Sequence, residues 1–236
     1  MAAQREQSRR LAPLVLAATL GMLCLLVAGP GSAGATPAKS LGNTGRTPEP
    51  SCPKTPCEAV GSVTGFQLVA DGTRAPFKAR QNSWIVGWAI DASQPKKSQH
   101  NFFADFYRSN VFGTVPTARI AVIKRREGRN YKLKSQSPVV PLSTSLGSRQ
   151  TFTLSSPLKI RKGEFLALSI PTWAPAFAVN LSSDNNVWRS SRAEGKCSGT
   201  ANIKAGKPQQ KVHSTRSYSC DYKTARLLYW GYYSPR

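Results

Sequence analysis

The sequence predicts an all-β domain: an antiparallel two-sheet sandwich, jelly-roll-like in topology and stapled by disulfides. Three observations lead to this fold class. From residue 61 onward, apolar and polar residues alternate in short runs, which Gly, Pro, Asn and Ser interrupt at intervals of about ten residues. No stretch carries an apolar stripe long enough for a helix of ordinary length. Four cysteines flank the runs, as is typical of small exported domains.

The chain begins with the features of a signal peptide, which we expect to span residues 1–35. Three arginines precede an apolar run from Leu11 to Ala28, and small residues follow a Pro/Gly patch, so cleavage is expected after Ala35. An uncleaved membrane anchor is the alternative, because this run is near the shortest helix that can span a bilayer. No later run approaches that length, so no membrane span is expected in the mature chain.

Residues 36–51 predict a flexible linker. They are rich in Pro, Gly, Thr and Ser and contain no aromatic residue. Such a segment buries too little apolar surface to offset the entropy lost when it becomes ordered. Residues 52–236 are then expected to form a single domain, and their number suffices for one hydrophobic core.

The four cysteines of the predicted domain indicate two disulfides. Cys52 and Cys57 enclose a short turn-rich loop, which favours a local disulfide, and Cys197 would then pair with Cys220. A pairing between the N-terminal and C-terminal cysteines stays open as the alternative, because spacing alone does not separate the connectivities. Neither spacing has the Cys-x2-Cys form of a zinc site, so no sulfur-bound metal is expected.

The strands follow from the alternation. Residues 84–90 are apolar on both sides, which predicts a central strand covered on both faces, and residues 118–123 have the same pattern. Alternating runs at 152–160 and 166–170 flank a Gly-containing turn and predict a β-hairpin. Residues 226–233 predict a final strand.

Weaker signals complete the predicted elements. Residues 66–70, 131–133 and 186–189 are short strand candidates. Aromatic residues recur at spacings of three to four between Asn101 and Phe112, but without a helix-length stripe. We expect a loop there, with about one helical turn.

A group of segments carries a family resemblance. They are the Cys-x4-Cys segment at residues 52–57, the Trp84/Trp88 strand, residues 157–177, the Trp188-Arg189 pair and residues 220–229. Together they make the chain resemble uncharacterised exported β-rich proteins of high-GC actinobacteria. The resemblance covers residues 52–236 and implies export and a β domain. That group has no assigned activity, so the resemblance supplies no catalytic residue.

Charge and composition limit the function. The chain has 33 Lys and Arg against 11 Asp and Glu, a net charge of +22, and only two His. Removal of residues 1–35 would leave +20, so the excess belongs to the mature chain. With so few carboxylates and imidazoles, neither a nucleophile with its general base nor a pair of catalytic carboxylates can be singled out. We therefore predict no catalytic residue.

One basic cluster stands out, and we predict that it binds an anionic ligand. It gathers six cations within eleven positions, opposed only by Glu127: Lys124, Arg125, Arg126, Arg129, Lys132 and Lys134. A loop or hairpin that carries them would attract polyanions such as phosphate polymers or acidic glycans. The alternative is a solvated basic surface without a specific ligand.

Aromatic residues add glycan stacking as a second binding mode. Trp173, between two prolines, and Trp188 are the stacking candidates, although at least three of the five tryptophans are expected in the core. We expect no cofactor. Calcium at the oxygen-rich segment 184–186 is the alternative to a simple turn there.

Together these features predict an exported, non-enzymatic protein, secreted or at the cell surface, that binds an anionic polymer or glycan of the cell envelope. No sequence-specific nucleic-acid module is present. One alternative is an extracellular carbohydrate-active enzyme, a hydrolase or lyase on a jelly-roll fold. Another is a structural surface protein that associates with copies of itself. The oligomeric state stays open.

Overall fold

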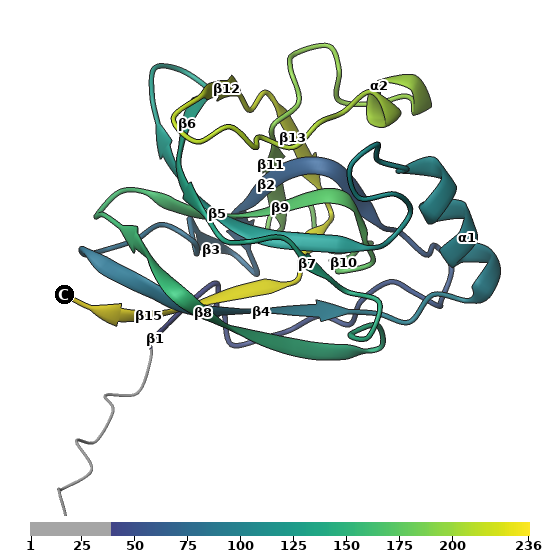
Figure 1. The fold of residues 1–236 in the computed structure, drawn as a ribbon, viewed down its shortest axis with the longest axis horizontal. Coiled ribbons are helices and arrows are strands. Elements are labelled where there is room, and N and C mark those ends of the chain that lie inside the picture. Colours follow the sequence, from purple (N-terminus) through teal and green to yellow (C-terminus); the bar gives the residue numbers. More distant parts are fainter. Residues whose placement is uncertain (1–38) are drawn as a thin grey trace, which may run out of the picture. The chain divides into compact units, whose positions relative to one another are not determined.

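A computed structural model describes residues 39–236 (Figure 1). The predicted signal peptide and its cleavage site lie outside the described residues. The described part is nearly all β, and its strands are antiparallel, which confirms the predicted fold class. The strands are β1 Lys39–Leu41, β2 Val60–Ala70, β3 Thr73–Arg74, β4 Ser83–Ala92, β5 Thr117–Arg125, β6 Asn130–Gln136, β7 Val140–Pro141, β8 Ser148–Ile160, β9 Phe165–Ala174, β10 Phe177–Ala178, β11 Val187–Ser190, β12 Thr215–Ser217, β13 Cys220–Lys223, β14 Arg226–Leu227 and β15 Tyr229–Pro235. The helices are α1 Lys97–Phe106 and α2 Thr200–Lys204.

The strands form two main layers, which Figure 1 shows one above the other. The smaller sheet has the order β1-β15-β4-β8. The larger sheet has the order β12-β6-β5-β9-β2-β11-β13, with β3 paired to β2 and β7 to β5. Strands β10 and β14 form a separate two-stranded ladder. Chain segments pass from one layer to the other between β4 and β5 and between β8 and β9, as expected for a jelly-roll-like sandwich.

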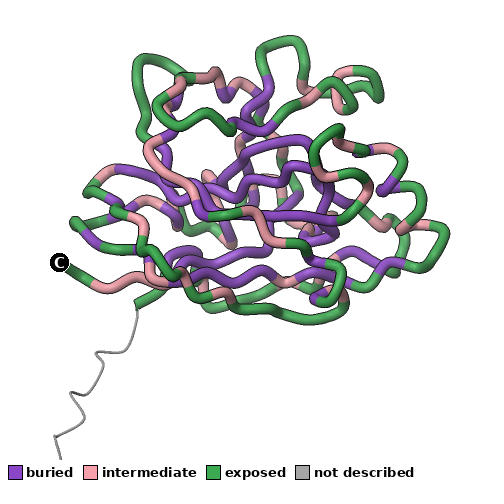
Figure 2. The backbone as a smooth tube through the Cα atoms, viewed as in Figure 1, coloured by how far each residue is buried: buried purple, intermediate pink, exposed green. Residues whose placement is uncertain are grey.

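The core lies between the two sheets. Ile85 and Trp88 of β4 pack into it from the smaller sheet, and Ile120 of β5 and Leu166 of β9 from the larger one. All four side chains are fully buried, and β9 is buried along its whole length. Figure 2 shows the buried backbone concentrated in the central strands and the exposed backbone in the peripheral loops.

The sheets pack closely where Gly231 of β15 faces Leu166 of β9. A Cβ at position 231 would overlap the Cδ2 atom of Leu166. The leucine side chain therefore occupies the space that any other residue at 231 would need. Burial of residues such as Leu166 is worth about 2 kcal/mol each in transfer free energy, so this contact contributes to holding the layers together.

The predicted β-hairpin at 152–170 is wrong, although both of its strands exist. Strand β8 pairs with β4, whereas β9 pairs with β2 and β5, so the connection at 161–164 crosses between the sheets. The physical reason is burial. Strand β9 has no exposed residue and fits only a central position, while β8 is exposed over most of its length and forms an edge. Gly163, with φ of +88°, still makes the turn.

The prediction of a loop with about one helical turn at 101–112 holds for residues 107–112 only, because residues 101–106 belong to α1, a helix of ten residues. Lys96 donates its N–H to the side-chain oxygen of Gln99 at 2.8 Å, which closes the first turn. Phe103 and Ala104 are buried, and the Phe103 ring centroid lies 5.5 Å from that of Trp173. Packing against Trp173 thus stabilises a helix whose own apolar stripe is short. Neither helix of the described part is long and apolar enough to cross a membrane.

The predicted linker at 36–51 does not hold for residues 39–51, which belong to the domain. Strand β1 pairs with β15, and Leu41 is buried. The buried guanidinium of Arg226 donates hydrogen bonds to the carbonyl oxygens of Gly42 and Arg46, at 3.3 and 3.0 Å. The local composition does not predict the ordering of residues 39–51, because the partners that stabilise them lie about 180 residues away in the chain.

Both disulfides form as predicted, each between cysteines that are neighbours in the sequence. Cys52 is bonded to Cys57, and Cys197 is bonded to Cys220. The first disulfide packs with Phe103 and Trp173 beside α1, and the second ties the loop after β11 to the start of β13. The first bond therefore closes a short loop that packs on α1, and the second holds a segment with little regular structure against the larger sheet.

Candidate anion-binding cleft

The basic cluster predicted from the sequence surrounds the β5–β6 turn. Lys124 and Arg125 end β5, and Arg126 and Arg129 lie in the turn, all of them exposed. Lys124 is the register partner of Lys132 on β6. Two ammonium groups at directly opposed positions on one face of a sheet repel each other, so an anion beside them would be stabilised.

Strand β6 carries one extra residue in this ladder, and that residue is Lys134. Val122 pairs with Ser135 and Ile123 with Leu133, which leaves Lys134 without a partner on β5. A β-bulge of this kind bends the strand and redirects its side chains. Lys134 accordingly lines a cleft that borders the smaller sheet.

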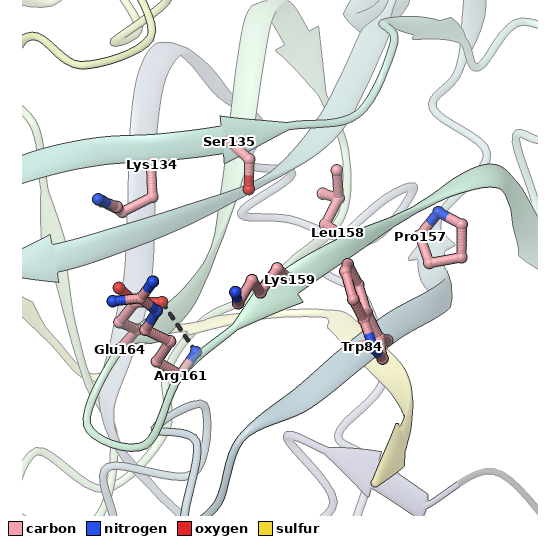
Figure 3. Close-up of a pocket in the computed structure, with 8 residues that line it drawn as sticks. All are labelled: Trp84, Lys134, Ser135, Pro157, Leu158, Lys159, Arg161 and Glu164. Atoms are coloured by element: carbon pink, nitrogen blue, oxygen red, sulfur yellow. Dashed lines mark hydrogen bonds between the residues drawn. The ribbon is translucent and has the colours of Figure 1, made fainter. Parts of the chain in front are cut away.

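We call this cleft the β8 cleft. It has a volume of about 310 Å³ and lies along β8, the edge strand of the smaller sheet, where β6 of the larger sheet passes by (Figure 3). Figure 3 shows Lys134 and Ser135 on one side of the opening, with Lys159 and Arg161 on the other. The full lining is Trp84, Lys134, Ser135, Pro157, Leu158, Lys159, Arg161 and Glu164.

Glu164 is the one carboxylate among the lining residues of the β8 cleft. Its side chain is buried, and it accepts a hydrogen bond from the backbone N–H of Arg161 at 2.8 Å. The next amide, of Lys162, donates to the side-chain oxygen of Asn82 at 3.1 Å. These bonds fix the crossing between β8 and β9, while three cations against one carboxylate leave the lining with an excess of positive charge.

Trp84 supplies an exposed aromatic ring at the β8 cleft. It is 36% exposed, whereas the other four tryptophans, all within the described residues, are buried. Trp84 is the register partner of Lys159, so ring and ammonium project from the same face of the sheet. The guanidinium carbon of Arg236 lies 4.7 Å from the ring centroid, which adds a fourth cation beside the aromatic surface.

The six predicted cations do not form one site. Lys134 lines the β8 cleft, and Lys124 and Lys132 continue along the same β5–β6 ladder. Arg125 instead donates to the carbonyl oxygen of Gly128 at 3.1 Å. Arg129 donates to the carbonyl oxygen of Ser219 at 2.8 Å and lies 3.5 Å from the carboxylate of Asp221, so it is engaged with the start of β13.

The prediction that Trp173 and Trp188 stack on a glycan is wrong, because both rings are buried. Trp173 is fully buried, and its indole N–H donates to the carbonyl oxygen of Thr114 at 2.9 Å. Trp188 is 3% exposed and stacks on Tyr222, with ring centroids 4.5 Å apart. The expectation that at least three tryptophans lie in the core is confirmed, and these two are among them.

The segment 184–186, weighed as a calcium site, joins the turn after β2. The side-chain oxygen of Asn186 accepts the N–H of Asp71 at 3.2 Å, and the carbonyl of Asn185 accepts that of Gly72 at 3.1 Å. Two of the oxygens that a cation would need are therefore already engaged. No group of three or more His, Cys, Asp or Glu residues that could hold a metal occurs in the described residues.

One cleft of the described part is lined by two carboxylates, the number that the alternative of a glycoside hydrolase requires. Glu49 and Asp91 line it, but each is ion-paired, with Lys54 at 2.7 Å and Arg149 at 3.3 Å. No aromatic residue lines that cleft. The exposed ring of Trp84 and these two carboxylates thus lie in different clefts.

No protein-family model, no curated protein and no solved structure matches the chain. What the site can do must therefore be inferred from its chemistry. The β8 cleft offers ammonium and guanidinium groups, an exposed indole and the unpaired edge of β8. These groups can bind an anion, stack on an apolar sugar face and hydrogen-bond to a chain that runs along the edge.

Proposed function

We propose that the protein binds an anionic glycan or polymer in the β8 cleft, as an exported, non-enzymatic binding domain. The observation that carries the proposal is the lining itself: Lys134, Lys159 and Arg161 converge on one opening, against a single carboxylate held by the backbone. Lys124 and Lys132 extend the positive surface along the β5–β6 ladder. An extended row of cations suits a polymer better than a single ion.

Trp84 favours a sugar-containing polymer over a simple polyphosphate. Sugars present C–H faces that pack on aromatic rings, and an exposed tryptophan beside ammonium groups matches a glycan that carries both such faces and negative charge. The two disulfides support export, because disulfides are stable in oxidising compartments. An exported protein would meet the anionic glycans of the cell envelope.

Self-association through the β8 edge is less favoured by the same geometry. The edge carries Pro157, which cannot donate to a ladder, and the charged Lys159. A register irregularity between Ile85 and Gly87 of β4 also distorts its pairing with β8. Bulges, prolines and charges are the means by which proteins prevent edge strands from pairing with other chains.

The test is retention of the full chain on an immobilised sulfated glycan at several salt concentrations. We expect the logarithm of the affinity to fall linearly with the logarithm of the salt concentration. The triple variant Lys134→Gln, Lys159→Gln, Arg161→Gln should reduce that slope by about two to three, because each lost contact releases one counterion fewer.

A matched control removes three exposed lysines elsewhere, with the changes Lys96→Gln, Lys97→Gln and Lys223→Gln. It loses the same charge but should keep most of the slope. Equal loss in both triple variants would indicate that net charge alone governs retention, and the assignment of the β8 cleft would fail. Absence of retention at low salt would reject anionic binding altogether.

A further inference from the structure

A second cavity lies in the segment between β11 and β13. This segment contains α2 and β12, and the Cys197–Cys220 disulfide ties it to β13. The cavity has a volume of about 460 Å³, within the range of small-molecule sites, and shares no lining residue with the β8 cleft. Its charged lining is wholly cationic and consists of Arg192, Lys196, Lys207 and Arg216.

Arg192 is the central observation. Its side chain is buried, with the residue 7% exposed, and its Nε has no hydrogen-bond partner in the described part of the chain. The two remaining nitrogens donate to the hydroxyl of Tyr222 at 2.9 Å and to the carbonyl oxygen of Gly61 at 3.2 Å. Both acceptors are neutral.

Within residues 39–236, Arg192 forms no ion pair with a carboxylate. Asp221, on the neighbouring strand β13, is instead bound by Arg189 at 2.7 Å and lies 3.5 Å from Arg129. A buried cation without a counter-charge is costly, and proteins keep one chiefly where something compensates it. An anion in the adjoining cavity would provide that compensation.

Neighbouring contacts hold the cationic groups in place. The Tyr222 hydroxyl donates to the carbonyl oxygen of Cys197 at 2.7 Å, so its lone pair is oriented toward Arg192. Arg216 donates to the carbonyl oxygen of Lys207, which ties the loop to β12. Lys196 and Lys207 are exposed at the rim. The cavity therefore combines two fixed guanidinium groups with two exposed ammonium groups.

We propose that this cavity binds a phosphate or sulfate group, carried by a small molecule or by the end of a chain. Guanidinium and ammonium groups together match the several oxygens of such a group better than the two of a carboxylate. The cavity is larger than the anionic group alone, so it also leaves room for the part of the ligand that carries it. This site does not depend on the glycan-binding function of the β8 cleft.

Calorimetry on the full chain with both disulfides formed tests the proposal. The probes are inorganic phosphate, sulfate and glycerol 3-phosphate, each at constant ionic strength set with sodium chloride. We expect saturable one-to-one binding. The double variant Lys196→Gln, Lys207→Gln should weaken it at least about tenfold, since two charge-assisted contacts are lost. The control Lys96→Gln, Lys97→Gln, which loses the same charge near α1, should stay within about twofold, because exposed charges that far away are screened.

A second variant removes the site without changing its charge. Ala205→Trp places a large side chain at an exposed position of the cavity lining and should abolish binding. Tighter binding of glycerol 3-phosphate than of inorganic phosphate would indicate a small phosphorylated molecule, and equal binding would indicate recognition of the anionic group alone, as at a chain end. Both results support the site.

Three results would overturn the proposal: no saturable binding by the wild type, full binding by both cavity variants, or loss of binding in the β8-cleft triple variant instead. The two proposals fail separately. If small anions do not bind but a sulfated glycan is still retained through the β8 cleft, only the cavity assignment is wrong.

Discussion

Arg226 and Asp71 form an ion pair that anchors the N-terminal segment to the sandwich. Arg226 is 1% exposed, and it also donates to the carbonyl oxygens of Gly42 and Arg46. Thr44 completes the cluster by donating its hydroxyl to Asp71 at 2.8 Å. Burial lowers the pKa of Arg226, and the charge of Asp71 opposes that shift. The segment that composition assigns to a linker is thus held by a buried charge.

The change Asp71→Asn should destabilise the fold by about 3 kcal/mol, because it leaves the Arg226 charge buried without its partner. Asparagine also tolerates the positive φ of 47° at this position, so backbone strain does not confuse the result. Urea denaturation gives the free energy of unfolding. The control Asp105→Asn breaks the exposed pair with Arg108 and should cost less than about 1 kcal/mol. Equal effects of the two changes would contradict the anchoring role.

The contact between Gly231 and Leu166 predicts a coupled pair of substitutions. Gly231→Ala should cost about 1–3 kcal/mol through overpacking, and Leu166→Ala about 2–5 kcal/mol through the cavity it creates. In the double variant the new methyl group enters the space that the leucine vacates. The combined cost should therefore be smaller than the sum by about 1 kcal/mol or more. Strict additivity in denaturation experiments would show that the sheets do not meet at this point.

Glu58 predicts a pH dependence of stability. Although Glu58 is an exposed residue, partial desolvation of its carboxyl group raises the pKa above the ordinary value of 4.5. The folded state therefore holds this proton more tightly than the unfolded chain does. Stability from this group is fully present below about pH 4.5 and is lost as the pH rises through the folded-state pKa.

The change Glu58→Gln removes that loss. The variant should gain stability relative to wild type as the pH rises from about 4.5 to 7, because the wild type must then ionise a partly desolvated carboxyl group. Denaturation midpoints at four pH values provide the measurement. Glu194→Gln, at an exposed position, is the control. A constant difference between Glu58→Gln and wild type across this range would refute the assignment.

Alternation in the sequence is enough to locate most strands but not to pair them. Residues 84–90 and 118–123 are recognised because both faces of β4 and β5 carry apolar residues. Two alternating runs across a glycine turn look the same whether the chain folds back beside itself or crosses to another sheet. Strands β8 and β9 lie in different sheets because they pair with different distant strands, β4 and β2 respectively. The local pattern does not contain that information.

The candidate cleft was predictable only in part for the same reason. Lys134 belongs to a run of cations that charge counting finds, and the bulge that brings it to the cleft has no evident sequence signal. Lys159 and Arg161 lie in the segment interpreted as a hairpin, and they meet Lys134 only because β8 ends a different sheet. The alternation places Trp84 in a strand, but its exposure depends on the neighbouring strands.

Trp84 provides the last prediction, which separates a glycan from a simple polyanion as the ligand of the β8 cleft. Trp84→Ala should weaken binding of a sulfated oligosaccharide about tenfold, roughly 1.4 kcal/mol, because the apolar sugar face loses its aromatic partner. Polyphosphate has no such face, so its affinity should change less than about twofold. Trp84→Phe should restore part of the loss, and Phe102→Ala, which removes an exposed ring on α1, should have no effect. Fluorescence anisotropy with labelled probes at one fixed salt concentration measures the affinities of the wild type and the three variants for both ligands. If Trp84→Ala weakens both ligands equally, the ring acts by supporting the neighbouring cations, and the cleft recognises charge without recognising sugar.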